Sequence, residues 1–231
     1  MSGEPPRKRV LYGRRRGRRL RPGQRGLKET LLPRLAVALP EKEGRLDPAG
    51  LFGHAVDEVW LEVGFGGGEH LAAQAAAHPS IGLIGCEVFE NGVVKLLGEV
   101  ERQRLGNVRI FVDDARLLIR ALPDRSLGRA FVLFPDPWPK VRHHKRRFVS
   151  TQMLTELARV LKNGAELRLA TDDVDYLRWM LERAPVHPDF EWLARRPADW
   201  RERPADWPPT RYEQKAIAAG RTPHFLRLRR R

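Results

Sequence analysis

The sequence predicts a doubly wound α/β fold, in which a mostly parallel sheet carries helices on both faces. Two observations predict it. From about residue 56, stretches rich in Val, Ile and Leu alternate with stretches of helical spacing, and the first of them enters a glycine-rich turn that opens an Ala-rich helix. Such strands are buried on both sides, because right-handed crossovers place helices over each face. The 231 residues suffice for one domain with appendages.

The expected elements follow in order along the chain. Residues 1–28 are Arg- and Gly-rich and predict a disordered arm, 29–55 a linker or helical segment, and 56–231 the folded domain with a basic C-terminal tail. The expected strands cover residues 56–63, 81–88, 107–115, 129–135 and 165–172. The helix before the last of these is expected to end at Gly164.

The positive charge is concentrated at the two ends of the chain. Residues 1–28 hold eleven Lys or Arg and one acid, and residues 225–231 hold four Arg, which together account for the net charge of +14. Such blocks suit a polyanion, since binding releases its condensed counterions. A third basic cluster within the otherwise neutral body favours nucleic acid over a merely solvated tail.

Other classes of protein are disfavoured. No apolar stretch approaches the roughly 20 residues of a membrane helix, and no apolar segment follows the basic start, so we expect a soluble, cytoplasmic protein. The single cysteine, Cys86, has no partner for a disulfide or a zinc site. No metal site is expected, because His143 and His144 lack a Cys or acid at ligand spacing.

The glycine turn predicts a cofactor site. Gly64, Gly66 and Gly68 allow a ligand to approach the start of a helix. A dinucleotide fingerprint would need a small residue where this chain has Glu69. Glu62 precedes the turn and suits a cationic group, such as the sulfonium and ammonium of S-adenosylmethionine. The turn could also be a helix start with incidental glycines.

Further acids follow the next two expected strands. Glu87 ends the second strand, close to the offset typical of a ribose-binding acid, and Asp114 ends the third, where it could accept the adenine amino group. Each could instead be a helix N-cap. Because the carboxyl ends of parallel strands meet at one edge, the acids are expected to face one crevice.

A proline-rich loop follows the fourth strand. Prolines on both sides of Asp136 are expected to hold Phe134 and Asp136 in extended conformations and so to fix the carboxylate. Trp138 could wall a flat substrate or belong to the core. Lys140 and the following run could bind phosphates or form a solvated helix start; the run comprises Arg142, His143, His144, Lys145, Arg146 and Arg147.

The motifs LEVGFGGGEH, GCEVFE, DDA, FPDPWPKVRHHKRR, TDDVDY and TRYE stand in this order. In this, the chain from about residue 56 to 225 resembles the tRNA (guanine-N7-)-methyltransferases, a class I S-adenosylmethionine-dependent family. The most specific element is the Phe-Pro-Asp-Pro-Trp block with its basic run. The resemblance implies a Rossmann-like, mostly parallel seven-stranded sheet, with tRNA as the substrate and its variable loop as the target. The long basic arm is not part of the shared pattern.

The resemblance also implies roles for individual residues. Cofactor contacts fall on Glu62, Glu87, Asp114 and Asp136, with Asp113 as an alternative to Asp114. RNA contacts fall along residues 142–147, and the substrate contacts are Lys140, Asp172, Thr210, Arg211, Tyr212 and Glu213. Thr210 and Glu213 also read as a capping box, and Asp172 as an N-cap.

The expected chemistry is methyl transfer to guanine N7 without a general base, because N7 has a free lone pair and no proton. Asp136 is the expected catalytic residue, which stabilises the cationic guanine as it forms. The alternatives are an exocyclic-amine methyltransferase on RNA or DNA, a nicotinamide dehydrogenase and a non-catalytic RNA-binding protein. The active unit is expected to be a monomer or a homodimer.

Overall fold

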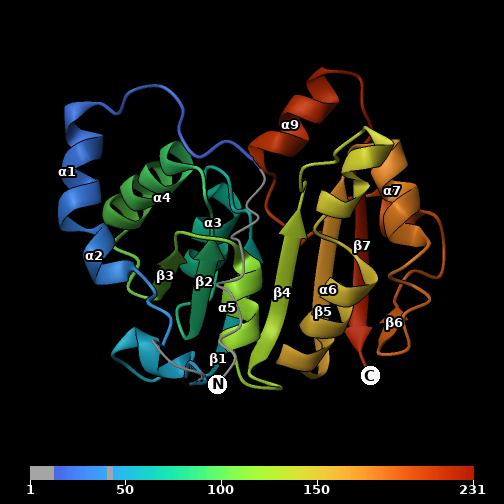
Figure 1. Ribbon diagram of the computed structural model, residues 1–231, viewed down its shortest axis with the longest axis horizontal. Helices are drawn as coiled ribbons and strands as arrows, with labels where there is room; N and C mark the ends of the chain where they lie inside the picture. The colour runs from blue at the N-terminus through green and yellow to red at the C-terminus, as the bar shows by residue number, and fades with distance from the viewer. Residues whose placement is uncertain (1–12, 41–43) are drawn as a thin grey trace, which may run out of the picture.

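A seven-stranded sheet forms the centre of the molecule. The computed structural model describes residues 13–40 and 44–231, so residues 1–12 of the expected arm lie outside the described residues. The strand order is β3-β2-β1-β4-β5-β7-β6, which confirms the doubly wound α/β class (Figure 1). The strands are β1 (Glu58–Val63), β2 (Ile81–Cys86), β3 (Val108–Phe111), β4 (Leu127–Leu133), β5 (Leu161–Thr171), β6 (Phe190–Trp192) and β7 (His224–Arg230).

The first five strands are parallel, and their carboxyl ends therefore meet at one edge. The strand β1 pairs with β2 on one side and with β4 on the other. From β1 the chain winds outward to β2 and β3 on one side, and from β4 it winds to β5 on the other. A crevice is therefore expected between the carboxyl ends of β1 and β4, where the direction of winding reverses. In Figure 1 this edge lies at the top of the sheet.

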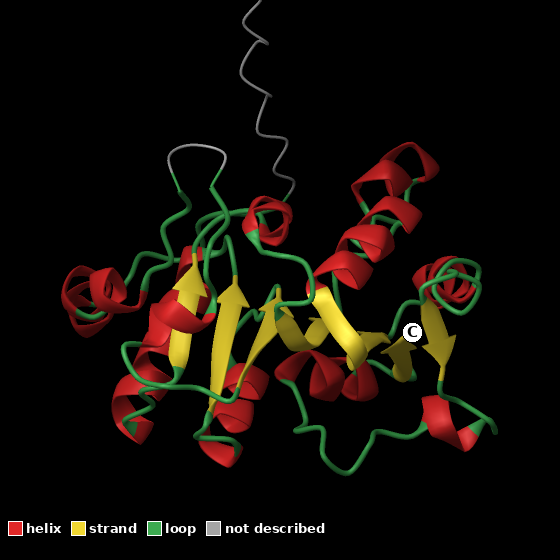
Figure 2. Cartoon of the chain, turned by 90° about the horizontal axis from the view of Figure 1, so that it is seen from below, coloured by secondary structure: helices red, strands yellow, loops and turns green. Residues whose placement is uncertain are grey.

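Helices cover both faces of the sheet (Figure 2). One core cluster contains buried side chains of α5, α6 and α7, and the other contains those of α3 and α4. The longer helices are α3 (Glu69–Ala77), α4 (Glu90–Gln103), α5 (Ala115–Ala121), α6 (Thr151–Val160), α7 (Val174–Leu181) and α9 (Arg211–Ala218). The helix α6 ends at Val160, four residues before the expected Gly164, because the chain enters β5 at Leu161.

The basic C-terminal segment is a strand of the sheet and differs from the expected tail. The strand β7 runs antiparallel to both β5 and β6. Leu226 and Leu228 are buried in the core, while the intervening Arg227 pairs with Glu166 at 2.7 Å. This alternation of apolar and charged side chains is the period of a strand, which the arginine content concealed.

The described part of the N-terminal arm is also ordered. Residues 22–30 form α1 (Pro22–Thr30), and the short helix α2 (Leu32–Leu35) follows. Leu27 and Leu31 pack against the second core cluster, and the Lys28 Nζ atom lies 2.5 Å from Glu90 Oε1. The expectation of disorder over 1–28 was therefore wrong for this part, because a few leucines among the arginines suffice to anchor it.

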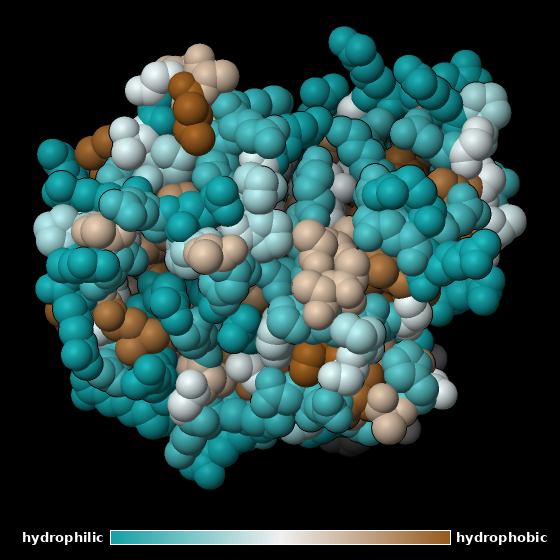
Figure 3. Space-filling model, turned by 180° about the vertical axis from the view of Figure 1, so that it is seen from behind, coloured by the Kyte–Doolittle hydropathy of each residue, from teal (hydrophilic) through white to brown (hydrophobic). Residues whose placement is uncertain are grey.

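The remaining elements are short. They are the 3₁₀ helices η1 (Ala49–Phe52) and η2 (Val141–Arg146) and the helix α8 (Ala198–Arg201). The face opposite to that of Figure 1 is mainly hydrophilic, with apolar atoms in small separate areas (Figure 3). Within residues 13–40 and 44–231, no helix combines the length and apolar character needed to cross a membrane.

Candidate active site

The glycine turn connects β1 to α3 as the sequence predicts. Gly64, Gly66 and Gly68 have φ values of 71°, 58° and 81°, in the left-handed region that favours glycine. At Gly66, a Cβ atom would lie 2.5 Å from the ring of Tyr212. Glycine is therefore required there both by the backbone and by the side chain packed against it.

Glu87 is held rigidly at the end of β2. Its carboxylate accepts hydrogen bonds from the backbone N–H groups of Gly66 (2.7 Å), Val88 (2.7 Å) and Phe89 (2.9 Å). Burial raises the pKa of the Glu87 carboxyl, and the backbone hydrogen bonds oppose this shift. The carboxylate is thus tied to the glycine turn and oriented for a ligand.

Two acids follow β3. The Asp114 carboxylate caps α5 by accepting the N–H of Arg116 at 3.0 Å, and it also pairs with the Arg116 guanidinium at 3.2 Å. Asp113 accepts the N–H of Asp114 at 2.8 Å. The N-cap role considered for Asp114 is present, and both acids still line the same cavity.

The loop after β4 presents Asp136 between two residues in left-handed conformations. Phe134 has a φ of 51° and Trp138 a φ of 46°, although each precedes a proline. The expected extended conformation of Phe134 was therefore wrong. Such positions cost about 1–3 kcal/mol each and cluster at functional sites. Burial raises the pKa of Asp136, whose carboxylate stays in contact with solvent at the mouth of the cavity.

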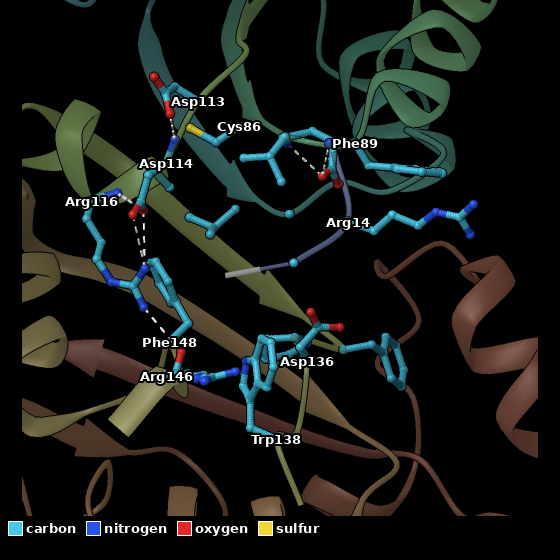
Figure 4. A pocket seen from close by; sticks show the side chains of 18 of the residues that line it. Arg14, Cys86, Phe89, Asp113, Asp114, Arg116, Asp136, Trp138, Arg146 and Phe148 are labelled. Carbon is cyan, nitrogen blue, oxygen red and sulfur yellow. Dashed lines mark hydrogen bonds and ion pairs between the residues drawn. The ribbon is translucent and has the colours of Figure 1, made fainter. Parts of the chain in front are cut away.

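These residues surround one cavity at the edge where β1 and β4 end. Its volume is about 370 Å³, and Figure 4 shows Asp113 and Asp114 across it from Asp136, Trp138 and Arg146. The acids that line it are Glu87, Asp113, Asp114 and Asp136, and other lining residues are Gly13, Arg14, Gly64, Phe89, Arg116, Phe148 and Tyr212.

The lining fits S-adenosylmethionine. The volume lies within the range of roughly 300–1,000 Å³ found for sites of drug-sized ligands. Fixed carboxylates suit both the ribose hydroxyls and a sulfonium charge, while Phe89 and Phe148 offer apolar surface for an adenine. Within the described ranges, no group of three or more His, Cys, Asp or Glu side chains could hold a metal ion.

Glu62 is not among the residues that line the cavity. It is 3% exposed, and its Oε2 lies 2.7 Å from Nδ1 of His70. A direct contact between Glu62 and the cofactor stays a prediction, as do contacts of Gly66 and Gly68, which also do not line the cavity.

The side chains of Lys140 and of the basic run over residues 142–147 point in different directions. Lys140, Arg142 and Lys145 are exposed, and the Arg146 guanidinium lies 5.0 Å from the centre of the Trp138 ring. Arg147 is 2% exposed, donates to the Pro137 carbonyl at 2.7 Å and pairs with Asp175.

The expected RNA contact of Arg147 is therefore wrong, because its charge is used inside the protein. His144 is also turned inward, with Nε2 3.6 Å from Asp175 and the imidazole against Trp179. The ring centres of His143 and Trp138 lie 6.0 Å apart, with the two ring planes nearly perpendicular. The contact of His143 with RNA stays a prediction.

Asp172 forms an ion pair with Arg221 at 2.7 Å and does not line the cavity. The N-cap of α7 is Asp173, not Asp172, and it accepts the N–H of Tyr176 at 2.7 Å. The role of Asp172 in substrate binding stays a prediction.

The four residues of the TRYE segment, 210–213, have different surroundings in the structure. Thr210 and Glu213 are both 6% exposed and form the capping box of α9. Arg211 lies 4.0 Å from Glu69. Tyr212 lines the cavity, and its pKa is raised by burial and by the nearby Glu87 carboxylate. Of these four residues, the cavity includes only Tyr212.

Sequence reasoning missed several lining residues. Gly13 and Arg14 belong to the arm that was expected to be disordered, and Arg116 and Phe148 lie just after the motifs that were recognised. A weak signal was present at the end of the arm and just beyond it, since Leu20, Leu27 and Leu31 stand at intervals that suit one apolar face.

Known proteins resemble the chain in both sequence and fold. A family model described as "Putative methyltransferase" matches residues 57–226. The tRNA (guanine-N(7)-)-methyltransferase of Paramagnetospirillum magneticum is 58% identical over 100% of this chain and 95% of its own length. That of Rhodospirillum rubrum is 53% identical over 100% and 91%, respectively.

Among solved structures, the 16S rRNA methyltransferase KamB matches with a TM-score of 0.53 at 18% identity, covering 76% of this chain and 89% of KamB. At that identity the likeness supports the fold alone. With a family model that spans most of its length and relatives above 50% identity from end to end, the chain belongs to the tRNA (guanine-N7-)-methyltransferases, S-adenosylmethionine-dependent enzymes of class I.

Proposed function

We propose that the protein methylates N7 of a guanosine in the variable loop of tRNA, and that Asp136 is its catalytic residue. One observation carries the proposal: the carboxylate of Asp136 stands at the mouth of a cavity whose inner wall holds three further acids, beside a surface of exposed Lys and Arg. The reaction is expected to take place in the cytoplasm, with one or two copies of the chain as the active unit.

The inner acids hold the methyl donor. The Glu87 carboxylate, fixed by three N–H groups, is oriented to accept hydrogen bonds from ribose hydroxyls. Asp113 or Asp114 accepts a hydrogen bond from the adenine amino group. When bound, S-adenosylmethionine supplies an electrophilic methyl group on a sulfonium. The protein holds this group beside Asp136 and keeps the guanine in line with it.

Asp136 acts through its charge and not as a base. Guanine N7 has no proton to lose, so the carboxylate is needed where positive charge develops on the base. Its position between two residues in left-handed conformations keeps it from turning away. Trp138, on the same loop, provides a flat surface for the base to stack on.

The exposed cations bind the RNA backbone. Lys140, Arg142 and Lys145 lie within nine residues of Asp136 and present their side chains to solvent. Contacts of this kind fix the orientation of the RNA but carry no sequence information. The base must therefore be selected at the cavity, and N7 is reachable where the RNA is opened, since A-form duplex hides this edge in a deep groove.

The decisive experiment combines the purified protein with labelled S-adenosylmethionine and tRNA from cells that lack N7-methylguanosine, followed by digestion and nucleoside identification. We expect label in N7-methylguanosine, which is cationic and alkali-labile, and mapping should place it in the variable loop. Label in a methylated exocyclic amine would contradict the proposal. So would donor binding without any transfer to RNA.

A further inference from the structure

A chain of buried hydrogen bonds lies beneath the glycine turn. Glu62 Oε2 lies 2.7 Å from His70 Nδ1, and His70 Nε2 lies 3.4 Å from the Gln74 amide nitrogen. The same amide donates to the Asp206 carbonyl at 3.2 Å. The pattern is consistent when His70 carries its hydrogen on Nδ1, so that Nε2 accepts from Gln74. A carboxylate, an imidazole and an amide thus connect β1 with a distant backbone carbonyl.

The burial of this chain is informative. Glu62, His70 and Gln74 are between 2% and 3% exposed. A buried polar group that loses its partner costs about 1–3 kcal/mol, whereas apolar side chains would fill the same space without that risk. The helix α3 places His70 and Gln74 on one face, four residues apart. In the segment that follows α8, Gln74 reaches the Asp206 carbonyl, and the Trp207 ring centre lies 6.3 Å from that of His70. The arrangement therefore serves to hold that segment.

The segment over residues 203–210 is irregular and needs such ties. Besides the bond from Gln74, the Asp206 carboxylate accepts from the Arg168 guanidinium at 2.6 Å. Trp207 is 1% exposed and lies 5.4 Å from Phe225, ring centre to ring centre. Asp206 is thus anchored through its backbone and its side chain, from two different elements of the fold.

The anchored segment leads back to the cavity. The capping box at Thr210 begins α9, and Tyr212 then lies against Gly66 at the mouth of the cavity. The series of contacts therefore begins and ends at the glycine turn. It starts at Glu62, two residues before the turn, and Tyr212 at its other end packs against Gly66. Since Tyr212 follows Asp206 by only six positions in the chain, a shift of the anchor would move the tyrosine.

We propose that Gln74 and His70 are positioning residues, which act through Asp206 to set the place of Tyr212 over the glycine turn. Neither touches the cavity. Their effect on methyl transfer would pass through Tyr212, and this kinetic part of the inference rests on the proposed function. The structural part does not, because the mobility of the segment can be measured in the protein alone.

The test uses Gln74→Met, which keeps the side-chain volume and removes the amide. The matched control is Gln103→Met on α4, whose amide donates to Glu99 at the surface. Hydrogen exchange of residues 206–213 should become about tenfold faster in Gln74→Met and stay unchanged in the control. The kcat/KM for tRNA should fall about tenfold, while the Kd for S-adenosylmethionine stays within about twofold.

A double-mutant cycle with Tyr212→Ala separates positioning from general damage. If Gln74 acts through Tyr212, its substitution has little further effect on kcat/KM in the Tyr212→Ala protein. His70→Asn offers a second route should Gln74→Met fold poorly, since it keeps a nitrogen near Glu62 and removes the link to Gln74. It should reproduce the loss of kcat/KM and the faster exchange.

Unchanged exchange in both variants would overturn the inference, and so would losses that add independently to that of Tyr212→Ala. If the wild-type protein transferred no methyl group to tRNA, the proposed function would fail. The exchange experiment would then still decide the structural claim.

Discussion

The side-chain amide of Asn91 binds the main chain of the N-terminal arm at Gly17. Asn91 Oδ1 accepts the Gly17 N–H at 2.7 Å, and its Nδ2 donates to the Arg18 carbonyl at 2.7 Å. One residue before Asn91, the Glu90 N–H donates to the Arg15 carbonyl at 2.9 Å. Because these contacts use only the backbone of the arm, the arginine side chains remain exposed while Gly13 and Arg14 reach the cavity.

Replacing Asn91 by Ala should release this part of the arm. We expect tRNA affinity to fall several-fold, and the dependence of log Kd on log salt concentration to become shallower, because fewer phosphate contacts are formed. Filter binding between 50 and 200 mM salt measures both. The control is Gln103→Ala at the end of the same helix. An unchanged salt slope would show that the arginines make no phosphate contacts.

Asp136→Asn should abolish most turnover while leaving tRNA bound. The loss of one preorganised charge typically lowers kcat by about 10²–10³. Single-turnover methylation and a separate measurement of tRNA Kd distinguish the two effects. Asp57→Asn is a suitable control, because Asp57 is exposed and precedes β1 at the opposite edge of the sheet. A variant at Asp136 with normal turnover would remove the residue from the mechanism.

The affinity for S-adenosylmethionine should fall as the pH becomes acidic. Burial raises the pKa values of Glu87 and Asp136, so these groups take up protons at a higher pH than exposed carboxyls. As pH falls through the raised values, the negative charge is lost and the donor Kd should increase. Calorimetric titration across this range checks the effect, and Glu87→Gln should flatten the profile.

The same shifts have the opposite consequence for the cofactor-free protein. A carboxyl whose pKa is raised on folding binds its proton more tightly in the folded state. Its contribution to stability is therefore present below the unfolded pKa and is lost as pH rises through the interval up to the folded pKa. Thermal unfolding of the wild type and Glu87→Gln should diverge in this interval; parallel curves would exclude the effect.

Substitution of two arginines of the basic run should affect different properties of the protein. Arg147→Ala removes a buried guanidinium and should lower the free energy of unfolding by about 1–3 kcal/mol, a modest value since its partner Asp175 is largely exposed. Arg142→Ala should leave unfolding unchanged and weaken tRNA binding. Denaturant titration paired with tRNA binding tests both. Equal effects on stability would contradict the orientation of the run.

Gly66→Ala should damage the cofactor site. A Cβ atom there would meet the Tyr212 ring, and the left-handed backbone costs about 1–2 kcal/mol for a residue with a side chain. Because the Gly66 N–H holds Glu87, we expect the donor Kd to rise about tenfold. Gly106→Ala is the control, since nothing lies within 4 Å of its added Cβ. An unchanged Kd would show that the turn adapts.

The parallel half of the fold could be predicted because its signals are local. The strands β1 to β5 are apolar runs bounded by turns, and Glu87, Asp114 and Asp136 follow strand ends whose relative position the parallel topology dictates. Their convergence on one cavity required no knowledge of side-chain packing.

The rest depended on contacts between distant residues. The residues from Arg142 to Arg147 are all of basic type, and only the contacts of Arg147 with Asp175 and the Pro137 carbonyl distinguish it as the arginine that turns inward. The arm was misjudged because its order depends on the packing of Leu27 against the core and on the hydrogen bond from Gly17 to Asn91, more than 70 residues away. Strand β7 was missed because its arginines are neutralised across the sheet by Glu166 and Glu191.

The placement of β7 has a consequence for biosynthesis. The strand β6 joins the sheet solely through β7 among the described pairings, and β5 meets β7 along six residue pairs. Until residues 224–230 have been synthesised, β5 is therefore an unpaired border, open to association with other nascent chains. Removal of β7 from the sheet would expose this border and favour aggregation.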